Sequence, residues 1–233
     1  MFVSCASGAR SLQLMRQGHG QRQNRAVCSM SSGAGVDFVF YRGVSSRTRS
    51  APVSWFLHES GLRPGEHFKE VRLNLQAQET RDPAKNPHPF GKVPCVELAG
   101  EQTPGEVIFE SAAILSYLQR RYAAKDLTDA QLAAISSWVV WANASLGPGL
   151  VIDRSKQSTL DSLKVLDTLL ETAAFLVADR LTAADCAVVH LTVALRKFIP
   201  ELDPVLEKLP HLSAYLERLQ ATEGYQKYLV AEP

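Results

Sequence analysis

Patterns typical of β-strands stop after residue 128 of this 233-residue chain. Before that point, β-branched and aromatic runs such as Val36–Arg42 alternate with polar turns, whereas afterwards apolar residues such as Leu132 and Ile135 recur at helical spacing. A strand-bearing half followed by a purely helical half is typical of two domains with different architectures. We therefore expect an α/β domain over residues 36–122 and an all-helical domain over residues 129–233.

The first domain is predicted to run strand, helix, strand, an ill-defined helical stretch, two strands and a final helix. Pro52 suits the first turn of the first helix, Gly61 supplies its stop, and Ser111 opens the final helix. The expected strands cover residues 36–42, 71–75, 93–98 and 107–109, and the last two form a hairpin. In the second domain, the run Thr182-Ala-Ala-Asp185 predicts a capping box in which Asp185 bonds back to Thr182.

The first 36 residues contain four arginines and no acidic residue, and their Ser, Arg, Gln and Gly content cannot bury a core. Acid-free leaders rich in arginine and serine are typical of organellar transit segments. We predict that residues 1–35 are a disordered transit segment that is cleaved between Val27 and Gly35. Its expected destination is an organelle, with the chloroplast as the first choice and the mitochondrion as the second. If the leader is not a transit segment, the expected location is the cytoplasm.

Charge and hydropathy argue against two classes of partner. Outside the leader, 21 basic residues face 24 acidic ones, so no excess positive charge is available for nucleic acid. No apolar run reaches the eighteen or more residues that a membrane-spanning helix needs. Cys5 and Cys28 lie in the leader, and Cys95 and Cys186 are far apart in the sequence, which predicts a reducing compartment without a disulfide framework.

Two runs in the first domain resemble the glutathione-site signature of the glutathione S-transferase superfamily. They are Asn86-Pro-His-Pro-Phe-Gly-Lys-Val-Pro94 and Phe109-Glu-Ser-Ala-Ala-Ile-Leu-Ser-Tyr-Leu118. In the second domain, Leu181-Thr-Ala-Ala-Asp185 resembles the capping motif of that family, and Pro210-His-Leu-Ser-Ala-Tyr-Leu216 resembles its closing helix. The resemblance implies a thioredoxin-like N-terminal domain, an all-α C-terminal bundle, glutathione as the co-substrate, no metal, and a homodimer.

The resemblance also implies which residues hold glutathione. Val93 would pair its backbone with the cysteinyl part, and Pro94, after a cis bond, would fix the loop. Glu110 and Ser111 lie where a strand gives way to a helix N-terminus, whose free N–H groups suit the γ-glutamyl carboxylate. Two lysines, Lys85 and Lys92, are the choices for the glycyl carboxylate. Each feature also has a purely structural interpretation. Val93-Pro94 could be a turn that enters a strand, Ser111 an ordinary N-cap, and the two lysines solvated surface residues.

Catalysis would depend on the loop before the first helix. A free glutathione thiol is mostly protonated at neutral pH, so these enzymes stabilise its thiolate, commonly through a hydroxyl at the start of that helix. The helix pattern places the serine of the plant and theta-like classes on Arg47, next to Ser46. It places the Ser-Arg-Ser run of bacterial and fungal relatives on Thr48 to Ser50. We therefore predict Ser46 first and Thr48 second as the catalytic hydroxyl, with Arg49 as a charge-based contributor.

Three other side chains are assigned packing roles. Tyr41 lies too early for the tyrosine classes, Cys95 follows Pro94 in a strand, and His190 lies in an apolar helix. The first loop contains no cysteine, which argues against family members that attack with their own thiolate. The six histidines show no metal-ligand spacing.

We interpret the chain as a glutathione transferase that conjugates glutathione to hydrophobic electrophiles in detoxification, or that reduces peroxides. The second substrate is expected near Trp138, Trp141 and the loop over residues 147–155. The alternative is a non-catalytic docking domain, because Ile135–Ala142 and Phe175–Thr182 are similar to the transferase-like domains of the elongation factor gamma subunit and of multisynthetase complexes. The leader and the complete glutathione signature favour the enzyme.

Overall fold

A computed structural model describes residues 36–99, 104–148, 157–196, 199 and 202–231. The chain divides into two units, Met1–Ala34 and Gly35–Pro233, and the second unit contains all of the described residues. The predicted transit segment therefore lies outside the described residues, as does most of the 147–155 loop.

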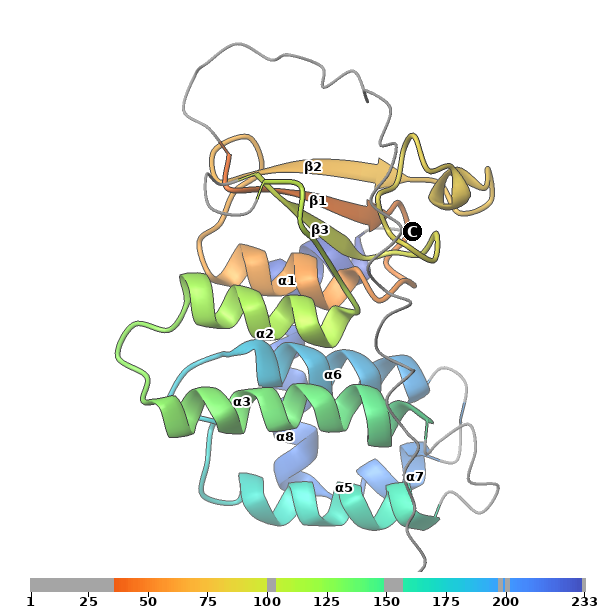
Figure 1. Ribbon diagram of the computed structural model, residues 1–233. Helices are drawn as coiled ribbons and strands as arrows, with labels where there is room; N and C mark the ends of the chain where they lie inside the picture. The colour runs from red at the N-terminus through yellow and green to blue at the C-terminus, as the bar shows by residue number, and fades with distance from the viewer. Residues whose placement is uncertain (1–35, 100–103, 149–156, 197–198, 200–201, 232–233) are drawn as a thin grey trace, which may run out of the picture. The chain divides into compact units, whose positions relative to one another are not determined.

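A mixed four-stranded sheet with the strand order β2-β1-β3-β4 forms the first layer (Figure 1). Its strands are β1 (Phe38–Gly43), β2 (Phe68–Leu73), β3 (Cys95–Leu98) and β4 (Val107–Phe109). β1 is parallel to β2 and antiparallel to β3, and β3 and β4 form the predicted hairpin. Phe38 and Phe40 are fully buried because alternate residues of β1 face the core.

Helices α1 (Ala51–Glu59) and α2 (Ser111–Tyr122) cover one face of this sheet (Figure 1). Pro52 occupies the first turn of α1 and Gly61, at φ 76°, follows its end, as predicted. The residues Ala51–Leu57 are all buried, because α1 lies between the sheet and helix α6 (Ala183–Arg196) of the second half. The ill-defined stretch between β2 and β3 contains one short 3-10 turn, η1 (Glu79–Arg81).

The second half is helical, and among the described residues no strand follows β4. Its elements are α3 (Asp129–Trp141), the π-helix η2 (Ala142–Leu146), α5 (Gln157–Leu170), α6, α7 (Asp203–Leu206), α8 (Pro210–Gln220), α9 (Glu223–Tyr225) and the π-helix η4 (Gln226–Val230). In Figure 1, α3 and α6 lie next to α1 and α2, and α5 lies farther from the sheet. Within the described ranges, no helix is long and apolar enough to cross a membrane.

Asp185 is the buried polar centre of the helical half. Its carboxylate accepts hydrogen bonds from the backbone N–H of Thr182 at 2.8 Å, as predicted, and from the Thr182 hydroxyl at 2.9 Å. It also accepts from the backbone of Leu176 at 3.0 Å and from the Tyr215 hydroxyl at 2.8 Å. Burial raises the pKa of Asp185, while these four donors favour the carboxylate. They tie α6 to the preceding loop and to α8.

Residues 222–224, near the C-terminus, are hydrogen-bonded to side chains of α1. The indole N–H of Trp55 donates to Thr222 at 3.0 Å, and the backbone N–H of Gly224 donates to the Glu59 carboxylate at 2.9 Å. A Cβ at position 224 would lie 2.8 Å from Trp55, so the close approach requires glycine. The first helix of the α/β half is therefore held by both halves of the protein.

Candidate functional site

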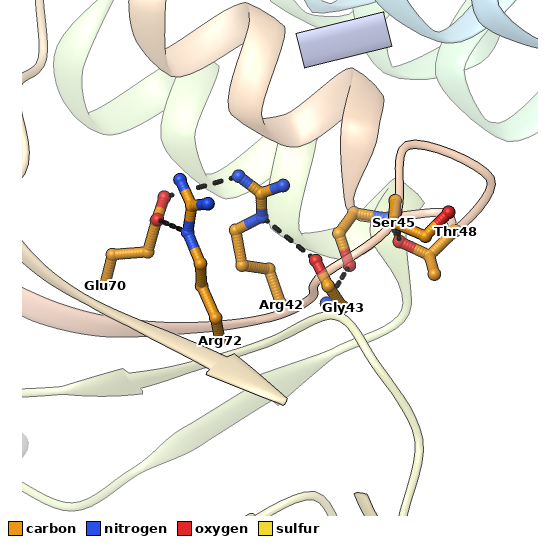
Figure 2. A network of polar contacts seen from close by, with 7 residues as sticks. Arg42, Gly43, Ser45, Thr48, Glu70 and Arg72 are labelled. Atoms are coloured by element: carbon orange, nitrogen blue, oxygen red, sulfur yellow. Dashed lines mark hydrogen bonds and ion pairs between the residues drawn. The ribbon is translucent and has the colours of Figure 1, made fainter. Parts of the chain in front are cut away.

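The loop over residues 44–50, which carries the predicted catalytic hydroxyls, closes back on Gly43. The Gly43 N–H donates to Ser50 Oγ at 3.1 Å, and its carbonyl accepts from Nε of Arg42 at 3.2 Å (Figure 2). The Thr48 hydroxyl donates to the Ser45 carbonyl at 3.1 Å. A Cβ at position 43 would lie 2.6 Å from Cγ2 of Thr48, so only glycine permits this packing. Gly43 therefore determines where Thr48 lies.

Beneath this loop, Arg42 is a fully buried cation at the end of β1. Its Nη1 lies 3.6 Å from the carboxylate of Glu70 on β2, and Glu70 also accepts from Arg72 Nε at 2.6 Å (Figure 2). The Arg42 guanidinium lies 5.6 Å from the ring centroid of Tyr228. A buried charge is costly unless it is paired, so these contacts keep the start of the loop in one position.

The loop before β3 contains the Val93-Pro94 bond, which is cis as predicted. Asn86 is buried and its amide donates to the carbonyls of Thr80 and Lys92, at 2.7 and 2.9 Å. The first asparagine of the sequence signature is therefore structural, because it holds the two ends of the loop together. Lys92, in contrast, is exposed.

Helix α2 begins at Ser111, and the residue before it, Glu110, has φ 70°. A positive φ is uncommon for a residue other than glycine, and such strained positions are concentrated at functional sites. Ser111 is the first helical residue rather than the N-cap, and its buried hydroxyl donates to Asn143 Oδ1 at 3.1 Å. The N–H groups of the first turn of α2 have no partner within the helix.

Asn143, on the π-helix η2, joins the two domains at the site. Its Oδ1 accepts from Arg49 Nη1 at 2.7 Å as well as from Ser111, and its amide nitrogen donates to the Val139 carbonyl at 2.9 Å. A Cβ at Gly147 would lie 3.3 Å from Nη2 of Arg49, so the guanidinium packs closely against that glycine. Asn143 was not predicted from the sequence. Its only signal is an amide residue in an otherwise apolar helical pattern.

Two adjoining pockets lie between these segments. The first, which we call the cis-proline pocket, has a volume of about 270 Å³ and is lined by Arg49, His88, Lys92, Val93, Pro94, Glu110, Ser111 and Asn143. The second, which we call the basic pocket, has a volume of about 400 Å³ and is lined by Arg47, Thr48, Arg49, Leu75, Gln78, Thr80, Arg81, Gly91, Lys92 and Val93. The pockets share Arg49, Lys92 and Val93. Six residues that the sequence pointed to for the glutathione site line the cis-proline pocket, namely Arg49, Lys92, Val93, Pro94, Glu110 and Ser111, whereas Lys85 lines neither pocket.

Burial lowers the pKa of two side chains in the cis-proline pocket, Arg49 and His88. Burial lowers the pKa of Arg49, an effect that the nearby Glu110 carboxylate opposes. Burial is also the main cause of a lowered pKa for His88, with Glu110 opposing it and Lys92 adding to it. His88 is therefore neutral at pH 7, and the cations of this pocket are Arg49 and Lys92.

The other predicted residues lie in different surroundings. Thr48 lines the basic pocket, whereas Ser46 lines neither of the two pockets. Lys85 is exposed, paired with Glu79 at 2.9 Å and outside both pockets, whereas Lys92 lines both.

The residues that were assigned packing roles are in the interior or paired. The Tyr41 hydroxyl donates to Glu97 at 2.7 Å, and His190 is buried. Cys95 is fully buried, and burial raises the pKa of its thiol to about 12, which makes it a poor nucleophile. In the described part of the chain, no group of three or more His, Cys, Asp or Glu side chains is placed to hold a metal ion.

Trp138 and Trp141, predicted to lie near the second substrate, are half-buried, and their ring centroids are 5.4 Å apart. Neither ring lines the two pockets.

The fold and the site define a two-domain protein with a thioredoxin-like domain that carries a cis-proline loop and an all-helical second domain. In sequence comparisons, the family described as the N-terminal domain of glutathione S-transferase matches residues 41–120. The family described as its C-terminal domain matches residues 150–223. The two matches together span more than half of the chain, in the order found in that superfamily. The chain belongs to the glutathione S-transferase superfamily.

Solved structures confirm the fold at low sequence identity. The glutathione transferase URE2P5 from Phanerochaete chrysosporium superimposes with a TM-score of 0.69 and is 20% identical, over 86% of this chain and 96% of that one. A glutathione transferase homolog from Lodderomyces elongisporus, solved with two GSH per subunit, gives 0.67 and 21%, over 84% and 99%. A glutathione transferase from Pseudomonas putida, with one glutathione disulfide per subunit, gives 0.66 and 18%, over 87% and 94%. A comparison with curated protein sequences found no match.

Proposed function

We propose that this protein is a glutathione transferase that binds glutathione in the cis-proline pocket and extends it into the basic pocket. The observation that carries the proposal is that six residues from three separate segments, all expected from the sequence to bind glutathione, line one pocket. Similar structures from Lodderomyces elongisporus and Pseudomonas fluorescens hold glutathione, which supports the same co-substrate here.

The chemistry of the pocket suits each part of the tripeptide. The γ-glutamyl carboxylate would accept from the free N–H groups of the first turn of α2, and from the Ser111 hydroxyl once that hydroxyl turns from Asn143 to the ligand. The carboxylate of Glu110 would face the γ-glutamyl ammonium group. The cysteinyl part would pair with the backbone of Val93, and the glycyl carboxylate would meet Lys92 and Arg49, which the two pockets share.

We assign the thiolate-stabilising hydroxyl to Thr48 rather than to Ser46, because Thr48 lines the basic pocket beside Val93. The Thr48 hydroxyl donates to the Ser45 carbonyl at 3.1 Å, so we propose that it rotates from that carbonyl to the glutathione sulfur while its oxygen keeps accepting from the Ser50 N–H at 3.3 Å. Once ionised, the sulfur attacks the electrophilic carbon, the carbon–sulfur bond forms, and the leaving group departs with its bonding electron pair. With a hydroperoxide, the thiolate attacks the terminal oxygen, the oxygen–oxygen bond breaks, and the alkoxide departs with the electron pair and takes up a proton. A second glutathione then converts the glutathione sulfenic acid into glutathione disulfide and water.

The proposal extends to the assembly and location of the protein. Phe90 is 70% exposed, and its ring lies 5.9 Å from that of Phe109. An exposed aromatic side chain beside the site supports a homodimer in which this surface is covered. The arginine-rich leader also leads us to propose import into an organelle, with the chloroplast as the first choice and the mitochondrion as the second.

Retention on immobilised glutathione, followed by an assay with a neutral aryl chloride, tests the function. Specific elution by free glutathione together with conjugation is the expected result. Retention without any conjugation or peroxide reduction would support the non-catalytic docking alternative. Failure to bind glutathione, by retention and by calorimetric titration, would contradict the proposal.

A further inference from the structure

Arg42, near the end of β1, has a side chain that is fully buried. Arginine is almost never fully buried unless it is paired, because removing a charge from water is costly. Even where such a cation is paired, replacing the buried ion pair with apolar residues of similar volume is often neutral or stabilising. The stability of the sheet therefore does not explain why a cation lies here, and the contacts of the guanidinium indicate another role.

One contact of Arg42 leads to the loop that carries Thr48. The Arg42 Nε donates to the carbonyl oxygen of Gly43 at 3.2 Å, and the N–H of the same glycine donates to Ser50 Oγ at 3.1 Å (Figure 2). Gly43 in turn limits where Thr48 can lie, because a Cβ at this glycine would be 2.6 Å from Thr48 Cγ2. A shift of the Gly43 backbone would therefore change the position of the Thr48 hydroxyl.

Two other elements hold the guanidinium of Arg42. Its Nη1 lies 3.6 Å from the carboxylate of Glu70 on β2, and its central carbon lies 5.6 Å from the ring centroid of Tyr228 on η4. A cation is attracted to an aromatic ring at this distance, and more strongly where water is excluded. Tyr228 is itself buried, and its ring lies 5.9 Å from that of His58 on α1. The C-terminal π-helix thus contacts the side chain that bonds to the active-site loop.

We propose that Arg42 is a positioning residue for the Thr48 hydroxyl, and that the Tyr228 ring holds Arg42 in the orientation that this requires. The inference rests on the proposed transferase function and concerns the same site. Neither side chain lines the cis-proline pocket or the basic pocket, so neither is placed to touch glutathione there. Both act on the pKa of the bound thiol, because a hydrogen bond from Thr48 to the sulfur weakens when its distance and angle change.

Tyr228→Leu is the first test, because it removes the ring without removing a charge. The pKa of the bound glutathione thiol should rise, and kcat at neutral pH should fall about three- to tenfold, the value of one ordinary hydrogen bond. The loss should disappear at high pH, where the thiol ionises without help. The Kd of glutathione should be unchanged. Ultraviolet absorbance of the thiolate gives the pKa, calorimetric titration gives the Kd, and Tyr228→Phe, which keeps the ring, should restore the parent pKa.

Substitutions of Arg42 separate position from charge. Arg42→Lys keeps the cation but loses the planar group that donates to Gly43 while it faces Glu70, so it should raise the thiol pKa as Tyr228→Leu does. Combining Arg42→Lys with Tyr228→Leu should raise the pKa no further, because the ring acts through Arg42. If Arg42→Lys keeps the parent pKa and only Arg42→Met raises it, charge alone acts and the inference is wrong. Arg42→Met leaves Glu70 paired with Arg72, at 2.6 Å.

Tyr215→Phe is the control for lost stability, because it removes a buried hydrogen bond to Asp185 in the helical half. It should weaken the fold in urea and leave the thiol pKa unchanged. If Tyr228→Leu and Arg42→Lys likewise weaken the fold and change neither the thiol pKa nor kcat, the two side chains only stabilise the protein and the inference is wrong, while the transferase function stands. If the parent protein neither binds glutathione nor conjugates an aryl chloride, the proposed function itself is wrong.

Discussion

Replacing Gly43 with alanine tests the role of Thr48 without removing its hydroxyl. The added Cβ would lie 2.6 Å from Cγ2 of Thr48 and 3.1 Å from its Oγ1. Carbon atoms in ordinary contact are about 3.5–4.0 Å apart, so the Thr48 side chain must move by roughly 1 Å. A hydrogen bond to a charged group is worth about 1.5–3 kcal/mol, and a displacement of that size removes most of it. We expect turnover at neutral pH to fall about ten- to a hundredfold.

The sign of the pH effect follows from the same contact. A hydroxyl that donates to the sulfur stabilises the thiolate, so its loss raises the pKa of the bound glutathione thiol. The variant should therefore recover toward the parent rate at high pH, where the thiol is ionised without help. The assay is a titration of the ultraviolet absorbance of the bound thiolate, compared with the pH–rate profile of the same variant.

Two further variants control for misfolding and for the alternative group. Thr48→Ser removes the Cγ2 atom that the new Cβ would meet, so adding it to Gly43→Ala should restore most of the lost activity. Gly147→Ala crowds Arg49 instead, since its Cβ would lie 3.3 Å from Nη2 of Arg49. If Gly147→Ala shifts the pKa of the bound thiol with strong salt dependence and Gly43→Ala does not shift it, the thiolate is stabilised by the Arg49 guanidinium.

The assignment to Thr48 is refuted if the pKa of the bound glutathione thiol is the same in Gly43→Ala, in Thr48→Ala and in the parent protein. Ser46→Ala is then the decisive variant, because Ser46 is the other hydroxyl that the sequence favours.

Four other predictions follow from the site, the helical half and the leader. Ser111→Ala should weaken glutathione binding about tenfold and change kcat less, because it removes a contact made in the ground state, which calorimetric titration and steady-state kinetics together would show. Asn143→Ala should raise the KM for glutathione about three- to tenfold, because Arg49 loses the acceptor that holds it at the pocket, and an unchanged KM would contradict this role. Asp185→Ala should lower the free energy of unfolding in urea by about 3–5 kcal/mol, since several buried donors lose their acceptor. Tyr215→Phe, which removes one of those bonds, should lower the free energy of unfolding by about 1 kcal/mol. Equal losses in the two variants would contradict the role of Asp185 as the buried polar centre of the helical half. Residues 1–36 fused to a fluorescent protein should carry it into an organelle, and uniform cytosolic fluorescence would contradict the transit interpretation.

Local sequence signals predicted most of the fold. Pro52, Gly61 and Ser111 each mark a helix boundary by their own backbone preferences, and the structure places the boundaries at or next to them. β2 was expected to begin at residue 71 and begins at Phe68. Lys69 and Glu70 follow Phe68, and on this edge strand they interrupt the apolar alternation that marks a strand.

The stretch after β2 shows a different limit. Residues 74–94 contain several polar residues and four prolines but no apolar periodicity, so a helix could be neither placed nor excluded there. The structure forms only the short turn η1 and holds the remainder through Asn86, whose amide bonds to Thr80 and Lys92. Such side-chain contacts to the backbone have no periodic signature in a sequence.

The site residues that could be predicted lie in short sequence motifs, and the one that was missed has partners far away in the sequence. Val93, Pro94 and Ser111 were predicted because each lies in a short motif whose residues are neighbours in the chain. Asn143 was missed because its role depends on partners 94 and 32 positions away, and because a polar residue in a helix usually faces solvent. Only the folded chain shows that the π-helix η2 directs this amide toward the pocket.

These contacts separate the parts of the site that must stay fixed from those that can change. Arg49 and Ser111 are held by Asn143, and Thr48 is held against Gly43, so a change at any of them disturbs the glutathione site itself. Arg47 and Arg81 contact the pocket from exposed positions, and neither is buried in such a network. Substitutions of these two arginines should therefore weaken only the attraction between the basic pocket and the carboxylates of glutathione, whereas substitutions of Asn143 should displace Arg49 and Ser111.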